Sequence, residues 1–215
     1  MDFRLVGASL AGLTGLVASA AQAVQIDPIR YDMRNGESGT YTYHDETYTG
    51  SGNKAANGAA LSGGVGDLTD GVVATQNWID AEIAPNGPYV GWFTFDPTIT
   101  FYFSGTPTIN RVVFHFDDPN GLGGVMAPAG VTVDGVAQAI ADPAGSAPFA
   151  VEVTGLNIVA SSFDVGIQRR GSNIWIMLSE VEFFGDAVAA PTPGVLPLLA
   201  VGAAGLAGLA RRRAA

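Results

Sequence analysis

The sequence has no cysteine, few basic residues and only two histidines. Without cysteine it can form no disulfide, thiolate metal site or iron–sulfur cluster, so its core must be held together by packing. Its ten Lys and Arg residues are outnumbered by 20 Asp and Glu, and no basic cluster lies in the body of the chain. We therefore expect no nucleic-acid partner, because binding to phosphates requires a basic face.

Motifs of common catalytic sites are also missing. There is no G-x-S-x-G elbow, no H-E-x-x-H zinc motif and no glycine-rich phosphate loop that opens a helix. Paired acids such as Asp117–Asp118, Asp45–Glu46 and Glu180/Glu182 could in principle serve a glycosidase, which needs two suitably spaced carboxyl groups. Such pairs are common in turns and on solvated strand faces, so we predict a protein that is not an enzyme.

What the sequence does contain is typical of a turn-rich β protein. It has 29 glycines among 215 residues, and 47% of its residues are hydrophobic, which fits neither a disordered chain nor a helical bundle. Short β-branched and aromatic runs alternate with Gly, Pro, Asn and Asp, and their residues alternate between apolar and polar as in half-buried strands. These features predict an all-β, antiparallel β-sandwich or jelly roll. The clearest predicted strands are residues 98–103, 109–116, 131–136, 149–153, 162–167 and 174–184.

The segment 35–66 differs from the rest of the body. It contains the run GTYTYHDETYTGSGNKAANG, which is rich in polar residues. We expect a hairpin and a long loop that project from the sandwich.

The first 23 residues are typical of a secretory signal peptide. Arg4 supplies the positive charge, an apolar stretch follows, and Ala21-Gln22-Ala23 forms the small-x-small cleavage site. The alternative is an N-terminal membrane anchor, but the apolar stretch is shorter than the roughly 20 residues of a spanning helix. Export would leave a body that begins near Val24.

The last residues have the pattern of a membrane segment that stops at a basic tail. An uncharged run covers residues 194–210, and Arg211, Arg212 and Arg213 follow it. We expect a transmembrane helix in residues 194–215, with the arginines on the cytoplasmic side of the inner membrane. A buried core helix is the alternative, although such a helix seldom ends in a charge triplet.

This tail resembles a known sorting signal. Pro191 and Pro193 form a Pro-x-Pro motif in the linker 187–193, before the apolar helix and the arginine cluster. The arrangement resembles the PEP-CTERM signal of Gram-negative bacteria, with Thr192 in place of the central glutamate. The resemblance implies recognition by an exosortase, transient anchoring in the inner membrane and transfer to the cell surface or the extracellular space.

Within the body, residues 24–186, the part from about Leu61 to Gly185 resembles a second family. The run GDLTDGVVATQNW at 66–78 and the run IMLSEVEFFG at 176–185 are similar to the first loop and the last strand of discoidin domains, which are galactose-binding-like sandwiches. The counterparts of the family's residues are Asp70-Gly71, Thr75, Trp78 and Glu180, with one extra residue between Thr75 and Trp78. The resemblance implies a discoidin-like β-sandwich that binds carbohydrate.

The same resemblance implies a structural calcium ion. Asp70 and Glu180 would supply carboxylates and Thr75 a hydroxyl, and backbone carbonyls would complete the roughly 6–8 oxygen ligands of calcium. The alternative is that Asp70 forms an Asx turn and that Glu180 accepts a hydrogen bond from a nearby backbone amide. The three tryptophans, Trp78, Trp92 and Trp175, are predicted to be core residues.

Two loops carry residues suited to sugar recognition. Tyr43 and His44 lie in one, and Arg169 and Arg170 lie in the hairpin between the last two predicted strands. The alternative is that the tyrosines form one face of a strand and that the arginines neutralise nearby acids. The sequence thus predicts an exported, surface-sorted protein that binds carbohydrate or extracellular polysaccharide. The other hypothesis is a structural matrix or surface-layer protein that contacts other proteins.

Overall fold

The computed structural model describes residues 23–83 and 87–186. The predicted signal peptide, the linker with Pro191 and Pro193, and the segment 194–215 with Arg211, Arg212 and Arg213 lie outside the described residues, apart from Ala23. Within the described ranges, no helix is long and apolar enough to span a membrane.

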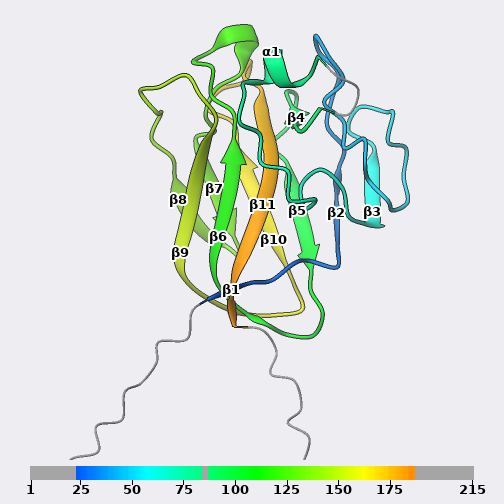
Figure 1. Ribbon diagram of the computed structural model, residues 1–215, viewed down its shortest axis with the longest axis vertical. Coiled ribbons are helices and arrows are strands. Elements are labelled where there is room, and N and C mark those ends of the chain that lie inside the picture. The colour runs from blue at the N-terminus through cyan, green and yellow to red at the C-terminus, as the bar shows by residue number, and fades with distance from the viewer. Residues whose placement is uncertain (1–22, 84–86, 187–215) are drawn as a thin grey trace, which may run out of the picture.

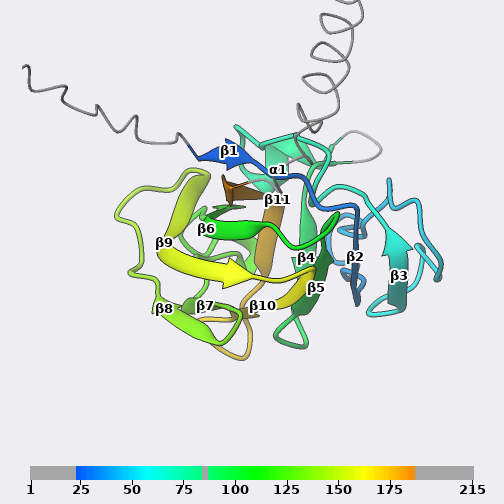
Figure 2. The same ribbon diagram turned by 90° about the horizontal axis from the view of Figure 1, so that it is seen from below.

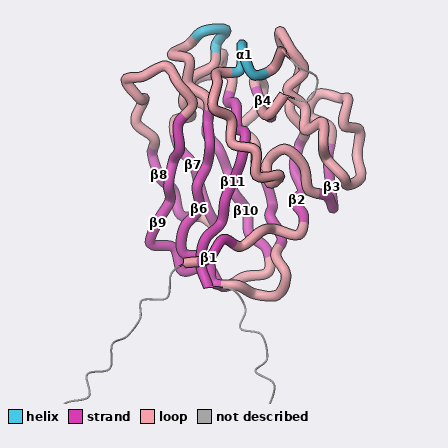
Figure 3. Tube along the Cα trace, viewed as in Figure 1, coloured by secondary structure: helices cyan, strands magenta, loops and turns pink. Residues whose placement is uncertain are grey.

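The described chain is an all-β protein, as the sequence predicted, and it contains two antiparallel sheets that pack face to face (Figures 1 and 2). The five-stranded sheet has the order β1-β11-β6-β9, with β4 also paired to β11, and the six-stranded sheet has the order β3-β2-β5-β10-β7-β8. In the residues that the structure describes, helix is confined to two short elements, α1 and η1, at one end of the sandwich (Figure 3). The elements are β1 Val24–Gln25, β2 Arg30–Arg34, β3 Ala60–Gly64, α1 Trp78–Ala81, β4 Val90–Trp92, β5 Thr98–Tyr102, β6 Thr108–Phe116, η1 Leu122–Gly124, β7 Gly130–Val133, β8 Val136–Ala139, β9 Phe149–Val159, β10 Ser162–Gln168 and β11 Ile176–Asp186.

Aromatic side chains from both sheets fill the space between the layers. Phe101 of the six-stranded sheet meets Phe183 of the five-stranded sheet with ring centroids 4.8 Å apart. Trp92 is fully buried in the same core, where its indole N–H donates to the Arg34 carbonyl at 3.0 Å. The alternation that predicted the strands also decides which residues enter this core, because successive side chains of a strand point to opposite faces.

One predicted strand is two strands in the structure. Residues 131–136 include the turn Asp134-Gly135, whose φ angles are +48° and +79°. Positive φ at both central residues is typical of a type I′ turn, which reverses the chain and joins β7 to β8. The predicted strand 131–136 therefore ends too late: β7 stops at Val133, and the Asp-Gly pair in the run VDGVA, which the sequence also predicts to form a turn, reverses the chain there.

The segment 35–66 is also more deeply integrated than predicted. It supplies β3 at the edge of the six-stranded sheet, and its Tyr48 is buried in the main core. Asp45 is fully buried, and its carboxylate accepts hydrogen bonds from the Tyr31 hydroxyl and from the Asp67 backbone amide. The segment does not simply project from the sandwich, because its polar groups are satisfied inside it.

This buried network gives a first testable prediction. A Cβ atom at Gly66 would lie far inside van der Waals contact with Asp45 Oδ1, and hydrogen bonds from Tyr31 and Asp67 hold this buried carboxylate in place. Gly66→Ala should therefore lower the free energy of unfolding by about 1–3 kcal/mol, as measured by urea denaturation. The matched control is Gly145→Ala, where a Cβ would meet nothing within 4 Å. Equal stability of the two variants would show that the Asp45 network does not constrain this segment.

Candidate functional site

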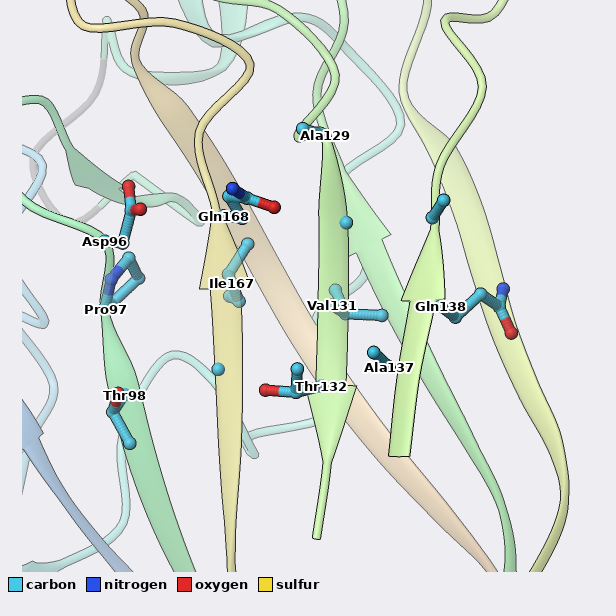
Figure 4. A pocket seen from close by; sticks show the side chains of 13 residues that line it. Asp96, Pro97, Thr98, Ala129, Val131, Thr132, Ala137, Gln138, Ile167 and Gln168 are labelled. Carbon is cyan, nitrogen blue, oxygen red and sulfur yellow. The ribbon is translucent and has the colours of Figure 1, made fainter. Parts of the chain in front are cut away.

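A groove with a volume of about 440 Å³ lies on the outer face of the six-stranded sheet (Figure 4). It crosses β5, β10, β7 and β8, and its volume lies in the range of about 300–1,000 Å³ that is usual for small-molecule sites. The strand pairing fixes its floor, because residues paired directly across antiparallel strands share one face. One row of the floor contains Thr98, Gly166, Thr132 and Ala137, and the next contains Gln168, Gly130 and Ala139.

The groove is hollowed because the residues on its floor have small side chains. A Cβ on Gly166 would lie 2.5 Å from Thr132 Oγ1, and one on Gly130 would lie 3.0 Å from the Gln138 carbonyl oxygen. Ala137 and Ala139 continue this low surface onto the edge strand β8. A ligand in the groove can therefore approach close to the backbone of four strands.

The groups that face the groove are mostly uncharged and polar. Thr98, Thr132 and Gln168 are exposed, and no hydrogen bond to their side chains is found within the described residues. A hydroxyl or a primary amide can both donate and accept, so these groups are available to a ligand that carries hydroxyl groups. Asp96 is the one ionisable residue among those lining the groove in the described chain, and it is paired with Arg169.

Arg169 and Arg170 lie where β10 ends, beside the groove, and their guanidinium groups are held by the protein. Arg169 Nε donates to Asp96 Oδ1 at 2.8 Å, and its Nη1 donates to the Phe93 carbonyl. Arg170 donates to the carbonyls of Ala127, Pro128 and Ile140 at 3.0–3.1 Å and lies 3.5 Å from Asp142. Both arginines thus fix the segments that flank β5, β7 and β8. Their predicted role as ligand-binding residues stays a prediction.

Tyr43 and His44 lie away from the groove, in the interior. Tyr43 is 2% exposed and packs edge-on against Trp78 and Trp175. His44 is 3% exposed, and its Nε2 lies 2.9 Å from Asn57 Oδ1. In this structure neither side chain presents a face to a ligand, although the sequence predicted both as ligand-binding residues. The reason is that the loop folds inward and satisfies its polar groups locally.

The tryptophans follow the prediction in two of three cases. Trp78 and Trp92 are buried, whereas Trp175 is partly buried against Tyr43 and Phe93. None of the three lines the groove, so the groove has no aromatic platform.

Asp70 and Glu180 are brought together by the fold, 110 positions apart in the sequence. Glu180 Oε2 accepts a hydrogen bond from the Gly71 amide at 3.1 Å, and Asp70 Oδ1 accepts one from the Val72 amide at 2.8 Å. These are the contacts of an Asx turn and of a backbone acceptor, as the alternative interpretation predicted. Both residues also line a cavity of about 210 Å³ together with Asp27 and Glu182.

The electrostatics of this second cavity favour a cation. Burial, and to a smaller extent the negative charges of Asp70 and Glu182, raise the pKa of Glu180 to about 8. The carboxylate oxygens here are suitable ligands for calcium, but they are fewer than the roughly 6–8 oxygens that calcium requires. Thr75 is exposed and is not among the lining residues, and no group of three or more His, Asp or Glu side chains in the described chain is placed to hold a metal ion. Calcium would therefore need backbone carbonyls and water as further ligands.

The two histidines have structural partners. His115 Nε2 lies 2.8 Å from Glu182 Oε2, as a cross-strand contact between β6 and β11, and His44 contacts Asn57. Asp117 and Asp118 are fully buried, so these acids do not face a solvent-accessible cleft as a glycosidase pair would.

Comparisons with known proteins give distant structural neighbours. No protein-family model and no curated sequence matches the chain. Among solved structures, it is similar to the lectin domain of Lectinolysin complexed with Lewis B antigen, with 16% identity, a TM-score of 0.38, and coverage of 56% of this chain and 83% of that one. It is also similar to a fucolectin from striped bass (Morone saxatilis) serum, with 14% identity, a TM-score of 0.39 and 78% coverage of both chains. A pectin-binding carbohydrate-binding module matches with 12% identity, a TM-score of 0.25, and coverage of 52% of this chain and 82% of that one. At these values the likeness identifies neither a family nor a ligand.

Proposed function

We propose that this chain is a non-enzymatic carbohydrate-binding protein that takes a neutral glycan in the groove across β5, β10, β7 and β8. The observation that carries the proposal is the groove itself. It combines a floor of Gly and Ala with unpartnered hydroxyl and amide groups of Thr98, Thr132 and Gln168. Sugar hydroxyls both donate and accept hydrogen bonds, and these side chains can do the same.

Charge selects a neutral ligand over an anionic one. Between Val24 and Ala190 the chain has six basic and 19 acidic residues, a net charge of −13. Such a surface repels polyanions, and the ion pair between Asp96 and Arg169 leaves no free basic group on the groove lining. A neutral extracellular polysaccharide is therefore the ligand class.

The predicted signals at the two ends of the chain supply the cellular context of the proposal. The signal peptide would direct export, and the exosortase would act on the Pro-x-Pro motif and the arginine tail before release to the cell surface. A galactose-binding-like, discoidin-like body with calcium at Asp70 and Glu180 belongs to the same proposal. A glycan-binding domain at the surface would then attach the protein to the polysaccharide that surrounds the cell.

Filling the groove should weaken binding. Ala137 on β8 and Ala60 on β3 are exposed alanines on the two edge strands of the same sheet, and Ala137 lines the groove whereas Ala60 does not. Ala137→Trp should weaken binding of the full-length chain to neutral polysaccharide at least tenfold, about 1.4 kcal/mol, in a pull-down or calorimetric titration. Ala60→Trp should leave the affinity unchanged.

Equal affinities of Ala137→Trp and the unmodified chain would contradict the groove as the site. Thr132→Val is a second variant that keeps the side-chain shape and removes only the hydroxyl, with an expected loss of about 0.5–1.5 kcal/mol. If crosslinking on intact cells captured protein neighbours and no polysaccharide, the surface-layer hypothesis would replace this one.

A further inference from the structure

Two consecutive carboxylates are buried at the helical end of the sandwich, where β6 ends. Asp117 and Asp118 are both 0% exposed and are followed by the turn that contains η1. Figure 3 shows α1 and the second short helix at this same end. The function proposed above does not use either residue.

Each carboxylate has one oxygen that is bonded and one that is not. Asp117 Oδ2 accepts from the Trp78 amide at 2.8 Å, and Asp118 Oδ1 accepts from the Asn120 and Ala127 amides at 3.1 and 3.3 Å. Asp117 Oδ1 and Asp118 Oδ2 are buried and have no hydrogen-bond partner among the described residues. A buried acceptor without a partner costs roughly 1–3 kcal/mol, and more when it is charged.

A third buried oxygen without a partner belongs to the adjacent segment. Asn77 is the N-cap of α1, but its Oδ1 makes no capping hydrogen bond, and this atom is buried and unpartnered in the described chain. Asn77 Nδ2 instead donates to the Ser146 carbonyl at 3.0 Å, while Asn120 Nδ2 donates to the Gly145 carbonyl at 2.7 Å. These bonds join the start of α1, the turn after Asp118 and the loop at 145–146 into one cluster.

No basic side chain of the described residues compensates the two carboxylates. None of the ion pairs found in the described chain includes Asp117 or Asp118. Burial, and to a smaller extent the charge of Asp118, raise the pKa of Asp117 to about 6. A buried water molecule could donate two hydrogen bonds here, but it would leave two uncompensated charges inside the protein.

We propose that Asp117 Oδ1, Asp118 Oδ2 and Asn77 Oδ1 bind a calcium ion between α1 and the turn after β6. The three donors are all oxygen atoms, which suits a hard divalent cation, and two carboxylates match its charge. Backbone carbonyls of the surrounding loops and water would complete the coordination of six to eight oxygens. The ion would tie α1 to the end of β6. This site is separate from the one at Asp70 and Glu180, which lies on the cavity beside β11.

Terbium(III), an ion that replaces calcium and emits when excited through a nearby tryptophan, tests the proposal on the full-length chain. Trp78 lies next to Asn77, and its amide contacts Asp117, so the unmodified protein should show tryptophan-sensitised terbium emission that calcium displaces. The double variant Asp117→Asn/Asp118→Asn should lose most of this emission. The matched control is Asp80→Asn, which removes an exposed carboxylate of the same helix and should leave the emission unchanged.

Emission from the double variant equal to that of the unmodified chain would overturn the proposal, and so would emission that calcium does not displace. A stronger displacement by magnesium than by calcium would overturn the assignment to calcium. If the double variant does not fold, Glu180→Gln provides the decisive measurement, because it leaves Asp117 and Asp118 intact. The folded Glu180→Gln chain should still bind one calcium ion in equilibrium dialysis, and the absence of any bound calcium would refute the site.

Discussion

Raising the pH from about 5 to about 9 in the presence of a chelator should lower the melting temperature, and Glu82→Gln should remove much of that loss. Glu82 follows α1 and is 5% exposed, and its Oε1 accepts from the Tyr89 amide at 3.0 Å. Burial, and to a smaller extent the charges of Glu46, Asp67 and Asp117, raise the pKa of Glu82 from 4.5 to about 8. Burial acts in the same direction on Asp45, whose pKa rises to about 7.

The stability falls with rising pH because the folded chain binds a proton that the unfolded chain has lost. Because its pKa is raised in the folded state, folded Glu82 holds a proton that the unfolded chain has lost, so its contribution to stability is fully present below pH 4.5 and disappears as the pH rises to about 8. Each pKa unit corresponds to about 1.4 kcal/mol, and 1 kcal/mol to roughly 2–4 °C in a protein of this size. Glu82→Gln keeps the acceptor and removes the charge. A pKa raised from 4.5 to about 8 corresponds to about 5 kcal/mol, so the variant should raise the midpoint at pH 9 by on the order of 10–20 °C.

The control for this experiment is Asp80→Asn, an exposed acid of the same helix, whose effect should stay within about 0.5 kcal/mol at either pH. Thermal unfolding followed by circular dichroism gives the midpoints. Two results would show that the carboxyl group of Glu82 is not the source of the pH dependence. One is a midpoint of the unmodified chain that does not change between pH 5 and pH 9, and the other is a Glu82→Gln midpoint that falls with pH as much as that of the unmodified chain.

Calcium should raise the melting temperature of the unmodified chain, and Glu180→Gln should reduce this rise. A ligand that binds only the folded state stabilises it by about 2.7 kcal/mol at a hundredfold excess over its Kd. For one ion at Asp70 and Glu180 this corresponds to a rise in melting temperature of roughly 5–11 °C. The calcium-induced rise of Glu180→Gln should be smaller than that of the unmodified chain by this amount. Glutamine can keep the hydrogen bond from the Gly71 amide, so the variant should remain folded.

Asp134→Asn is the matched control, because it removes an exposed carboxylate from a turn that also tolerates asparagine at positive φ. Its response to calcium should equal that of the unmodified chain. Equal calcium responses of Glu180→Gln and the unmodified chain would assign Asp70 and Glu180 to the turn and the sheet alone.

The sequence predicted the strands that alternate over a long stretch. In β6, Val112, Phe114 and Phe116 are buried, as the period of two required. The short strand β2 was missed, because a segment of five residues with three charged side chains shows only a weak alternation of apolar and polar residues. In the structure its Tyr31 and Met33 are buried, with Asp32 between them. Its sequence RYDMR carried the alternation that could have identified it.

The groove could not be predicted in the same way. Its floor depends on Thr98, Gly166 and Thr132 being directly opposite one another, and that pairing follows from a strand order that brings distant segments together. Small residues at alternate positions, such as Gly130 with Thr132 and Ala137 with Ala139, were the available signal. The approach of Asp70 to Glu180 was anticipated from a family resemblance, whereas the burial of Tyr43 and His44 depends on how a polar loop folds onto the sandwich.

The most direct test of glycan binding is to locate the ligand on the protein. We would titrate the ¹⁵N-labelled chain with a neutral oligosaccharide and follow the backbone amide resonances. The groove predicts that the largest shifts fall on Gly130, Thr132, Gly166 and Gln168, while amides of the five-stranded sheet change little. Shifts centred on Tyr43 and Trp175, or no shifts at saturating oligosaccharide, would contradict the groove as a carbohydrate site.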